Sequence, residues 1–283
     1  LMLVPRMLRA ARAKARIGWF CHIPWPPPDT FGILPWRSEI LEGLLGADVL
    51  GFHLPEYARH FRECVDRFTP YSIEDDHVVC RGRRITTITA PIGIPVDELQ
   101  ALSLDPDVNR EVERIRSMMN HRSIILGVDR LDYTKGIPER LAAFERLLRR
   151  DQRTRTRVAL VQVMVPSRTD VKAYADLKAE VDRMVGDING RYGETGRVPV
   201  HYLYRNLTQR ALFAHYRAAD VALVTPLRDG MNLVAHEYAA ARTDDDGVLV
   251  LSEFAGAAKH LEGAVLVNPY DIEATMTAIQ SAL

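Results

Sequence analysis

Two cationic side chains stand close together just after an apolar run that reads as a buried strand. The run covers residues 123–128, and Arg130 and Lys135 follow it in a short segment that ends at a proline, where the next helix should begin. Ligands of open α/β sheets bind outside the carboxyl ends of strands, and two cations there suit a diphosphate. Alternatively, both cations pair only with Asp129 and Asp132, and spacing alone does not decide between these interpretations.

A second segment whose residues could bind a ligand follows another apolar run, residues 221–224. Residues 225–237 read TPLRDGMNLVAHE, a glycine turn that opens a helix and offers unpaired backbone N–H groups to an anion. Glu237 falls more than one turn into this helix, where a carboxylate can accept hydrogen bonds from ribose hydroxyls. Taken alone, the segment is better explained by Asp229 as a helix cap and Glu237 as an exposed charge. Both segments together favour a diphosphate and ribose site.

Two further polar residues follow strand-like runs. His22 comes after residues 17–20 and precedes a stiff proline-rich loop, and Arg168 comes after residues 158–165. A lone histidine in such a place is more often structural, and an exposed cation is the default for Arg168, although it could bind a phosphate. The sequence has no HExxH or CxxC pattern, so we expect no metal site. It also has no Gly-Lys-Ser/Thr loop of an NTPase and no GxGxxG dinucleotide fingerprint.

The elements that position these residues alternate between apolar strand-like runs and longer segments of helical period. This alternation predicts an α/β fold with parallel sheets wrapped by helices. A hairpin is predicted at residues 77–89, where an Arg-Gly-Arg sequence supplies the turn. The predicted strands are residues 17–20, 49–52, 123–128, 158–165, 221–224, 248–251 and 264–267. The predicted helices are residues 37–45, 55–68, 138–150, 171–189, 208–218, 233–242 and 271–283.

A rigid segment, residues 91–95, precedes a charged stretch that leads into a new series of strands and helices. We therefore predict a domain boundary there, which gives residues 1–95 and 96–283. The chain begins with apolar residues that run straight into a basic helix-like stretch, and its last helix has neither a cap nor a polar tail. Both ends read as cuts within a longer protein.

Composition excludes several classes of function. The 283 residues include 37 basic and 37 acidic side chains, which cancel and leave no field to attract nucleic acid or an anionic membrane. No apolar run approaches the ~20 residues that span a bilayer, and no signal pattern opens the chain. Cys21, Cys64 and Cys80 are an odd number at wide spacing, which fits a reducing cytoplasm better than a disulfide framework. We predict a cytoplasmic protein.

The two segments RLDYTKG (residues 130–136) and TPLRDGMNLV (residues 225–234) resemble the signatures of retaining glycosyltransferases of the trehalose-6-phosphate synthase family. The resemblance implies a GT-B fold, in which two Rossmann-like domains face each other across the active site. Residues 1–95 would be the remainder of a truncated acceptor-side domain, and residues 96–283 the donor-binding domain. Other segments similar to the family are HIPWP (22–26), GFH (51–53), APIGI (90–94) and PSR (166–168).

The resemblance also implies a reaction: glucose passes from UDP-glucose to glucose 6-phosphate with retention, and trehalose 6-phosphate and UDP are formed. UDP-glucose is a substrate, and no metal or other cofactor is required. The implied catalytic residues are Arg130, Lys135, Asp229 and His22, and Arg168 would bind the acceptor phosphate. The implied donor-binding residues are Arg130, Lys135, Asn206, Leu207, Asp229, Gly230, Met231, Asn232, Leu233 and Glu237.

Several alternatives stay open at this point. A glucosylglycerol-phosphate synthase would use the same donor site with glycerol 3-phosphate, and a sugar-phosphate sensor would bind without catalysis. Family residues of the acceptor pocket precede the point where this chain starts, and the family's closing helix follows its last residue, so we expect a fragment with an incomplete acceptor pocket. A homo-oligomer, and a preference for GDP or ADP donors over UDP, are also open.

Overall fold

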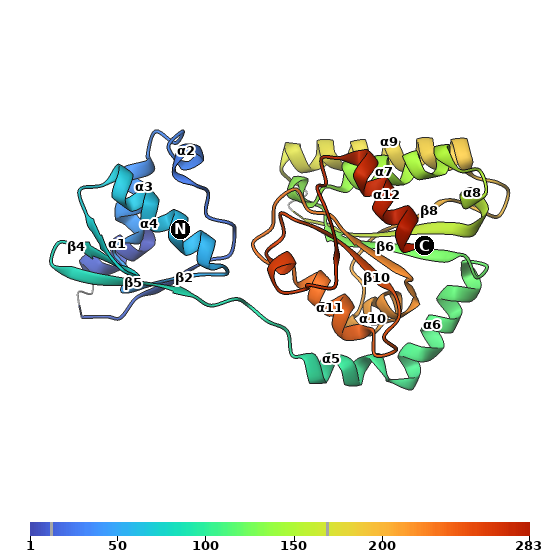
Figure 1. Cartoon of the computed structure of the whole chain (residues 1–283), viewed down its shortest axis with the longest axis horizontal. Coiled ribbons are helices and arrows are strands. Elements are labelled where there is room, and N and C mark those ends of the chain that lie inside the picture. The colour runs from blue at the N-terminus through green and yellow to red at the C-terminus, as the bar shows by residue number, and fades with distance from the viewer. Residues whose placement is uncertain (12–13, 168–169) are drawn as a thin grey trace. The chain divides into compact units, whose positions relative to one another are not determined.

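The structure is a computed structural model that describes the whole chain except residues 12–13 and 168–169. The chain forms two compact units, Leu1–Ile92 and Gly93–Leu283, and each is described by itself (Figure 1). The division falls inside the rigid segment that the sequence marks at residues 91–95.

The first unit is built around a mixed sheet with the strand order β1-β2-β5-β4-β3. The first three strands in this order are parallel, and the rest are antiparallel because β4 and β5 form the predicted hairpin. The strands are β1 (Gly18–Cys21), β2 (Val49–Phe52), β3 (Ser72–Glu74), β4 (His77–Cys80) and β5 (Arg83–Thr89). The helices are α1 (Val4–Ala11), α2 (Pro28–Phe31), α3 (Arg37–Leu44) and α4 (Pro55–Phe68).

An aromatic cluster forms the core of this unit. The Trp25 ring is buried and lies 5.0 Å from the ring centroids of both Phe31 and Phe61. Its indole N–H donates to the Cys64 sulfur at 3.5 Å, so the one polar atom of the ring has a partner. This packing fixes the proline-rich segment that follows β1.

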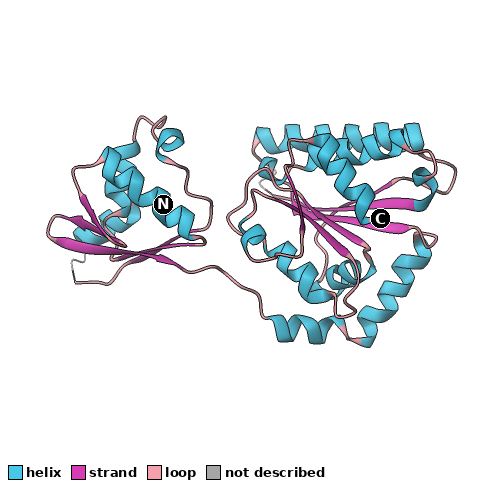
Figure 2. Cartoon of the chain, in the orientation of Figure 1, coloured by secondary structure: helices cyan, strands magenta, loops and turns pink. Residues whose placement is uncertain are grey.

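The second unit contains one fully parallel sheet with the strand order β11-β10-β9-β6-β7-β8. The sheet lies between two layers of helices (Figure 2). Its strands are β6 (Ser123–Arg130), β7 (Val158–Val165), β8 (Val200–Tyr204), β9 (Val221–Val224), β10 (Val248–Ser252) and β11 (Val265–Val267). Its helices are α5 (Val96–Ser103), α6 (Pro106–Met118), α7 (Ile137–Arg150), α8 (Thr154–Arg157), α9 (Lys172–Tyr192), α10 (Gln209–Ala218), α11 (Leu233–Ala241) and α12 (Ile272–Ala282), with short 3-10 turns η1 (Tyr133–Lys135) and η2 (Gly256–Lys259).

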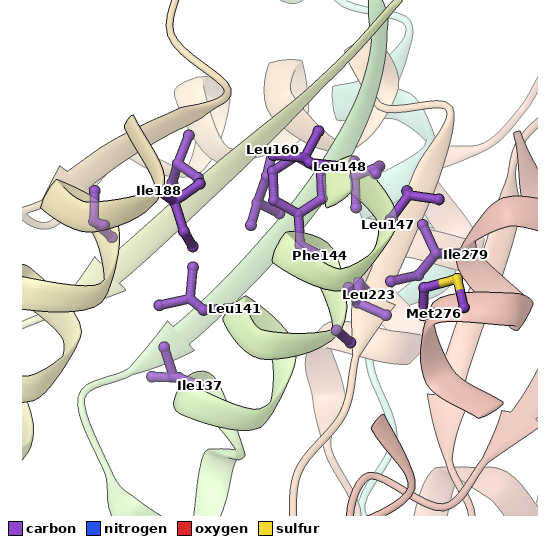
Figure 3. Packing of buried hydrophobic residues seen from close by; sticks show 14 of the residues in the cluster. Ile137, Leu141, Phe144, Leu147, Leu148, Leu160, Ile188, Leu223, Met276 and Ile279 are labelled. Atoms are coloured by element: carbon purple, nitrogen blue, oxygen red, sulfur yellow. The ribbon is translucent and has the colours of Figure 1, made fainter. Parts of the chain in front are cut away.

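Apolar side chains at helical spacing attach α7 to one face of this sheet. Ile137, Leu141, Phe144 and Leu148 recur every three or four residues and are fully buried (Figure 3). Helices α9 and α12 cover the same face, and α6, α10 and α11 cover the other (Figure 1). Burial on both faces explains why the central strands β6 and β7 read as continuous apolar runs.

Three helices and one strand of the second unit are missing from the sequence predictions, and the short helix α8 is one of them. The charged stretch before His121 forms α5 and α6, and the edge strand β8 follows α9. The start of α6 had a readable signal, because Asp105 caps it by accepting from the Asp107 N–H at 2.7 Å and a proline takes the first helical position.

Candidate functional site

The strand order of the second sheet reverses at its centre, between β6 and β9. Strands β6 and β9 are hydrogen-bonded neighbours, whereas their successors β7 and β10 lie on opposite sides of this pair. Loops that leave such strands at their carboxyl ends diverge and open a crevice, which is where ligands of doubly wound sheets bind. The two segments singled out from the sequence are these two loops.

The loop after β6 is held by its own side chains. The Asp132 carboxylate accepts hydrogen bonds from the Thr134 backbone N–H at 3.0 Å and its hydroxyl at 2.9 Å, and from the Tyr174 hydroxyl at 3.2 Å. Burial acts to raise the pKa of Asp132, but these donors outweigh it, and the pKa lies below its ordinary value. Gly136 then takes a left-handed conformation, with φ 63°, and α7 starts. Contacts within the chain therefore define the shape of this loop.

The loop after β9 ends at the N-terminus of α11. Asn232 caps the helix in a left-handed conformation, with φ 77°, and its side-chain oxygen accepts from the Ala235 N–H at 3.3 Å. Its amide group donates to Asp229 at 3.1 Å. From the segment after β10, Ala257 donates its backbone N–H to the Met231 carbonyl at 2.7 Å. The turn from Asp229 to Leu233 is thus supported at its back while the first N–H groups of the helix stay available.

An ion pair joins the two loops. The Lys135 ammonium lies 2.5 Å from the Asp229 carboxylate, and both side chains are largely buried. The Leu227 N–H also donates to the Thr134 carbonyl at 2.7 Å. Lys135 therefore pairs with the neighbouring loop, which argues against the alternative in which it pairs only with a carboxylate of its own loop.

Asp129 and Arg130, the last two residues of β6, differ in their burial and in their partners. Asp129 is buried and its carboxylate accepts from the Arg140 guanidinium at 2.5 Å, so it is not a partner of Arg130. Arg130 is exposed and makes no side-chain hydrogen bond or ion pair within the described residues, although its charge helps to lower the pKa of Asp132. One cation of the predicted pair is thus held in an ion pair, and the other is free to meet a ligand.

Glu237 lies four residues beyond the first residue of α11, and its side chain is half-buried. One carboxylate oxygen accepts from the hydroxyl of Tyr216 on α10 at 2.8 Å. Burial raises the pKa of Glu237 and the tyrosine hydroxyl opposes this change, with a net increase. An anchored carboxylate beside the anion-binding end of a helix is a suitable acceptor for paired hydroxyl groups.

The remaining predicted residues lie elsewhere in the chain. Asn206 and Leu207 are in the loop between β8 and α10, where Asn206 is exposed and Leu207 packs partly into the core. His22 belongs to the first unit, directly after β1, where its exposed ring lies 4.9 Å from the Phe20 ring and 5.6 Å from that of His53. Arg168 lies outside the described residues.

Sequence reasoning missed the residues that anchor these loops. Arg140 could have been noticed, because it interrupts the apolar stripe of α7 between Ile137 and Phe144. Nothing in the sequence around Tyr216 or Tyr174 indicates their hydrogen bonds to the two carboxylates. Such contacts depend on which helices become neighbours.

Within the described residues, no group of three or more His, Cys, Asp or Glu side chains is arranged to hold a metal ion. None of their helices is both long and apolar enough to cross a membrane. All three cysteines are buried and unpaired.

Comparisons with known proteins agree with the resemblance. Curated relatives include a bifunctional trehalose-6-phosphate synthase/phosphatase of Thermoproteus tenax, 48% identical over 285 residues, and a trehalose-6-phosphate synthase of Mycobacterium marinum, 48% identical over 293 residues. The whole chain is covered in both cases but spans only 39% and 59% of these relatives' lengths.

A similar solved structure is that of the UDP-forming alpha,alpha-trehalose-phosphate synthase of Burkholderia xenovorans in complex with glucose-6-phosphate. The TM-score is 0.95 at 38% identity, with all of this chain and 64% of the other covered. Such similarity shows that the chain has the GT-B fold. The sequence profile of glycosyltransferase family 20 covers residues 1–283, and the chain belongs to this family.

Proposed function

We propose that this chain carries the donor site of a glucosyltransferase that moves glucose from UDP-glucose to glucose 6-phosphate with retention, releasing trehalose 6-phosphate and UDP. The observation that carries the proposal is the Lys135–Asp229 ion pair at the N-terminus of α11, with Glu237 on the same helix. The UDP-forming relative from Burkholderia xenovorans, in complex with glucose-6-phosphate, supports both substrates.

The diphosphate of UDP is the leaving group, so the site has to stabilise the negative charge that develops as the glycosidic bond breaks. Lys135 and Arg130 supply two positive charges, and the first N–H groups of α11 supply the positive end of a helix dipole. Asp229 holds the Lys135 ammonium in place. Little reorganisation is then needed when the diphosphate arrives, and no metal ion is required.

The other predicted residues complete the site in this proposal. Glu237 accepts from the ribose hydroxyls, and Asn206 and Leu207 meet the uracil ring. The turn through Gly230, Met231, Asn232 and Leu233 contacts the transferred glucose and the phosphates. His22, from residues 1–95, touches the donor sugar, and Arg168 binds the acceptor phosphate; residues 96–283 form the donor domain. The enzyme acts in the cytoplasm, and a homo-oligomer is compatible with this scheme.

The intact donor site favours an enzyme over a sugar-phosphate sensor. Arg130, Lys135, Asp229 and Glu237 are all present, and Lys135 and Asp229 are directly paired in the structure. A sensor that arose by loss of catalysis is expected to lack some of these side chains. Product analysis with glucose 6-phosphate and glycerol 3-phosphate as alternative acceptors identifies the acceptor of the enzyme.

Calorimetric titration tests the donor site directly. We expect UDP and UDP-glucose to bind without added metal, and Lys135→Ala to weaken UDP by roughly 2 kcal/mol, as for a charge-assisted hydrogen bond to an anion. Lys178→Ala is the matched control, because Lys178 pairs with a surface carboxylate on α9. Uridine, which lacks the diphosphate, should bind both variants as it binds the wild type. Equal UDP affinity in the wild type and Lys135→Ala would contradict the proposal.

A pair of ligands with and without ribose hydroxyls tests the role of Glu237. Glu237→Gln should weaken UDP and leave the affinity for 2′,3′-dideoxy-UDP unchanged, because that ligand lacks the hydroxyls that the carboxylate would bind. A loss of the same size for both ligands would show that Glu237 does not contact the ribose.

A further inference from the structure

A buried guanidinium lies directly beneath the two loops of the donor site. Arg140, in the second turn of α7, is fully buried, and its Nη1 group donates to Asp129 at 2.5 Å and to Gln162 at 3.1 Å. Its Nε donates to the Thr225 hydroxyl at 3.1 Å, and Nη2 donates to the Lys135 carbonyl at 3.4 Å. These four hydrogen bonds use four of the five N–H groups of the guanidinium.

The neighbouring polar groups are oriented toward this guanidinium. Gln162 is buried on β7, and its amide donates to the carbonyls of Gly127 at 3.3 Å and Val163 at 3.2 Å, which turns its oxygen toward Arg140. A Cβ atom on Gly127 would lie 2.5 Å from Arg140 Nη1 and 2.4 Å from the Gln162 oxygen. A larger residue at this position of β6 would therefore have to displace the two side-chain ends and disturb their hydrogen bonds.

Stability alone does not explain such an arrangement. Removing two charges from water offsets most of the attraction between them, and well-packed apolar residues of similar volume often replace a buried ion pair without loss. The sequence instead keeps a charge where the stripe of α7 is otherwise apolar. What the guanidinium provides, and an apolar side chain cannot, is a fixed set of directions toward several partners.

Two of these partners belong to the donor loops. The Lys135 carbonyl is part of the loop after β6, and Thr225 is the first residue of the loop after β9. We propose that Arg140 is a positioning residue of the donor site: it fixes the bases of both loops relative to each other and thereby aligns Lys135 with Asp229. Arg140 itself touches no ligand.

The charge of Arg140 does not compete with this role. Arg140 is fully buried beside Asp129, with 2.5 Å between the two charged groups, so the cations that can face a diphosphate are Lys135 and Arg130. Burial raises the pKa of Asp129, and the adjacent guanidinium and the Lys135 ammonium reduce this increase. The inference rests on the proposed function, because nucleotide affinity is the property through which the alignment acts.

Two substitutions, one at Arg140 and one at its partner Thr225, test the inference. Thr225→Val removes the hydroxyl that accepts from Arg140 and leaves the buried Arg140–Asp129 pair intact. Arg140→Lys keeps the positive charge but loses the forked geometry of the guanidinium. We expect each to weaken UDP binding about tenfold, because a buried donor loses its partner and the loops lose their register. The control is Leu147→Ala, a fully buried residue near the opposite end of the same helix. It should lower the unfolding midpoint as much as Arg140→Lys does and leave the UDP affinity within about twofold of the wild type.

A double-mutant cycle separates positioning from general damage. If Arg140 acts through Lys135, Thr225→Val should cost little further affinity in a Lys135→Ala background, so the two effects should not add. Fully additive effects, or UDP affinities that follow the unfolding midpoint in Leu147→Ala as well, would overturn the inference. Equal UDP affinity in the wild type, Thr225→Val and Arg140→Lys would overturn it while leaving the proposed function standing. A folded wild-type chain that binds no UDP overturns both.

Discussion

Replacing Gly136 by alanine should damage both the stability of the second unit and its affinity for nucleotides. Gly136 joins η1 to α7 with φ 63°, a conformation that residues with a side chain rarely adopt. A Cβ atom there would lie 2.3 Å from the Thr225 carbonyl oxygen and 3.3 Å from the Leu227 side chain. The first of these neighbours is backbone, so it cannot move aside as the end of a flexible side chain could.

Two contributions set the size of the effect. The left-handed conformation costs a non-glycine residue about 1–2 kcal/mol. Forcing an extra carbon into a packed site costs about 1–3 kcal/mol more. We therefore expect Gly136→Ala to lower the free energy of unfolding by roughly 2–5 kcal/mol, and to weaken UDP binding because Lys135 is the adjacent residue.

Denaturant titration can assign the loss to the correct unit. All three tryptophans, Trp19, Trp25 and Trp36, belong to the first unit, so their fluorescence reports on that unit alone. Far-UV circular dichroism reports on both units. We expect Gly136→Ala to shift the dichroism transition to lower denaturant while the tryptophan transition stays where it is in the wild type.

A matched glycine provides the control for this experiment. Gly186 lies inside α9, and a Cβ atom there would meet nothing within 4 Å. Gly186→Ala should therefore stabilise the chain by about 0.5–1 kcal/mol. If Gly136→Ala unfolds at the same denaturant concentration as the wild type, the conclusion that the loop requires a glycine is wrong.

Three further outcomes follow from the titrating groups. Burial raises the pKa of Glu237, so ionisation of this carboxyl costs stability as pH rises from its ordinary pKa toward the raised one. Glu237→Gln, which can still accept from Tyr216, should therefore gain stability relative to the wild type as pH rises above about 4, and an unchanged difference would contradict this. The pKa of Asp132 is lowered, so the stability lost in Asp132→Asn should be constant at neutral pH and shrink below about pH 4 as the wild-type carboxylate is protonated, which thermal unfolding at several pH values measures. Burial raises the pKa of Cys21 and Cys64 to about 11, so a thiol reagent at about pH 8 should label them rapidly only after unfolding, and fast labelling of the native chain would contradict their burial.

Local features of the fold could be predicted because they depend on neighbouring residues in the chain. The strand at residues 158–165 and the helix at residues 55–68 have the predicted bounds, since each is a strongly patterned run between clear breaks. The two loops after β6 and β9 were also found, because a strand followed by a turn and a helix leaves a readable signal.

Spatial neighbours were much harder to predict. Nothing in the sequence says that β9 lies beside β6 while β7 and β8 lie on the far side, and only this order brings Lys135 to Asp229. The anchoring of Glu237 by Tyr216 depends in the same way on the contact between α10 and α11. Charged helices were missed for a different reason: α5 and α6 bury few of their residues, so their apolar pattern is sparse.

The ion pair between Lys135 and Asp229 also links ligand supply to the persistence of the folded chain. Its two residues are 94 positions apart, so the pair forms only after the intervening strands and helices have assembled. A nucleotide that bridges the loops would therefore bind the complete second unit and have no affinity for the unfolded chain. At a concentration of about 100 times its dissociation constant, it would add about 2.7 kcal/mol to the unfolding free energy. A chain stabilised in this way would resist proteolysis best when that nucleotide is abundant.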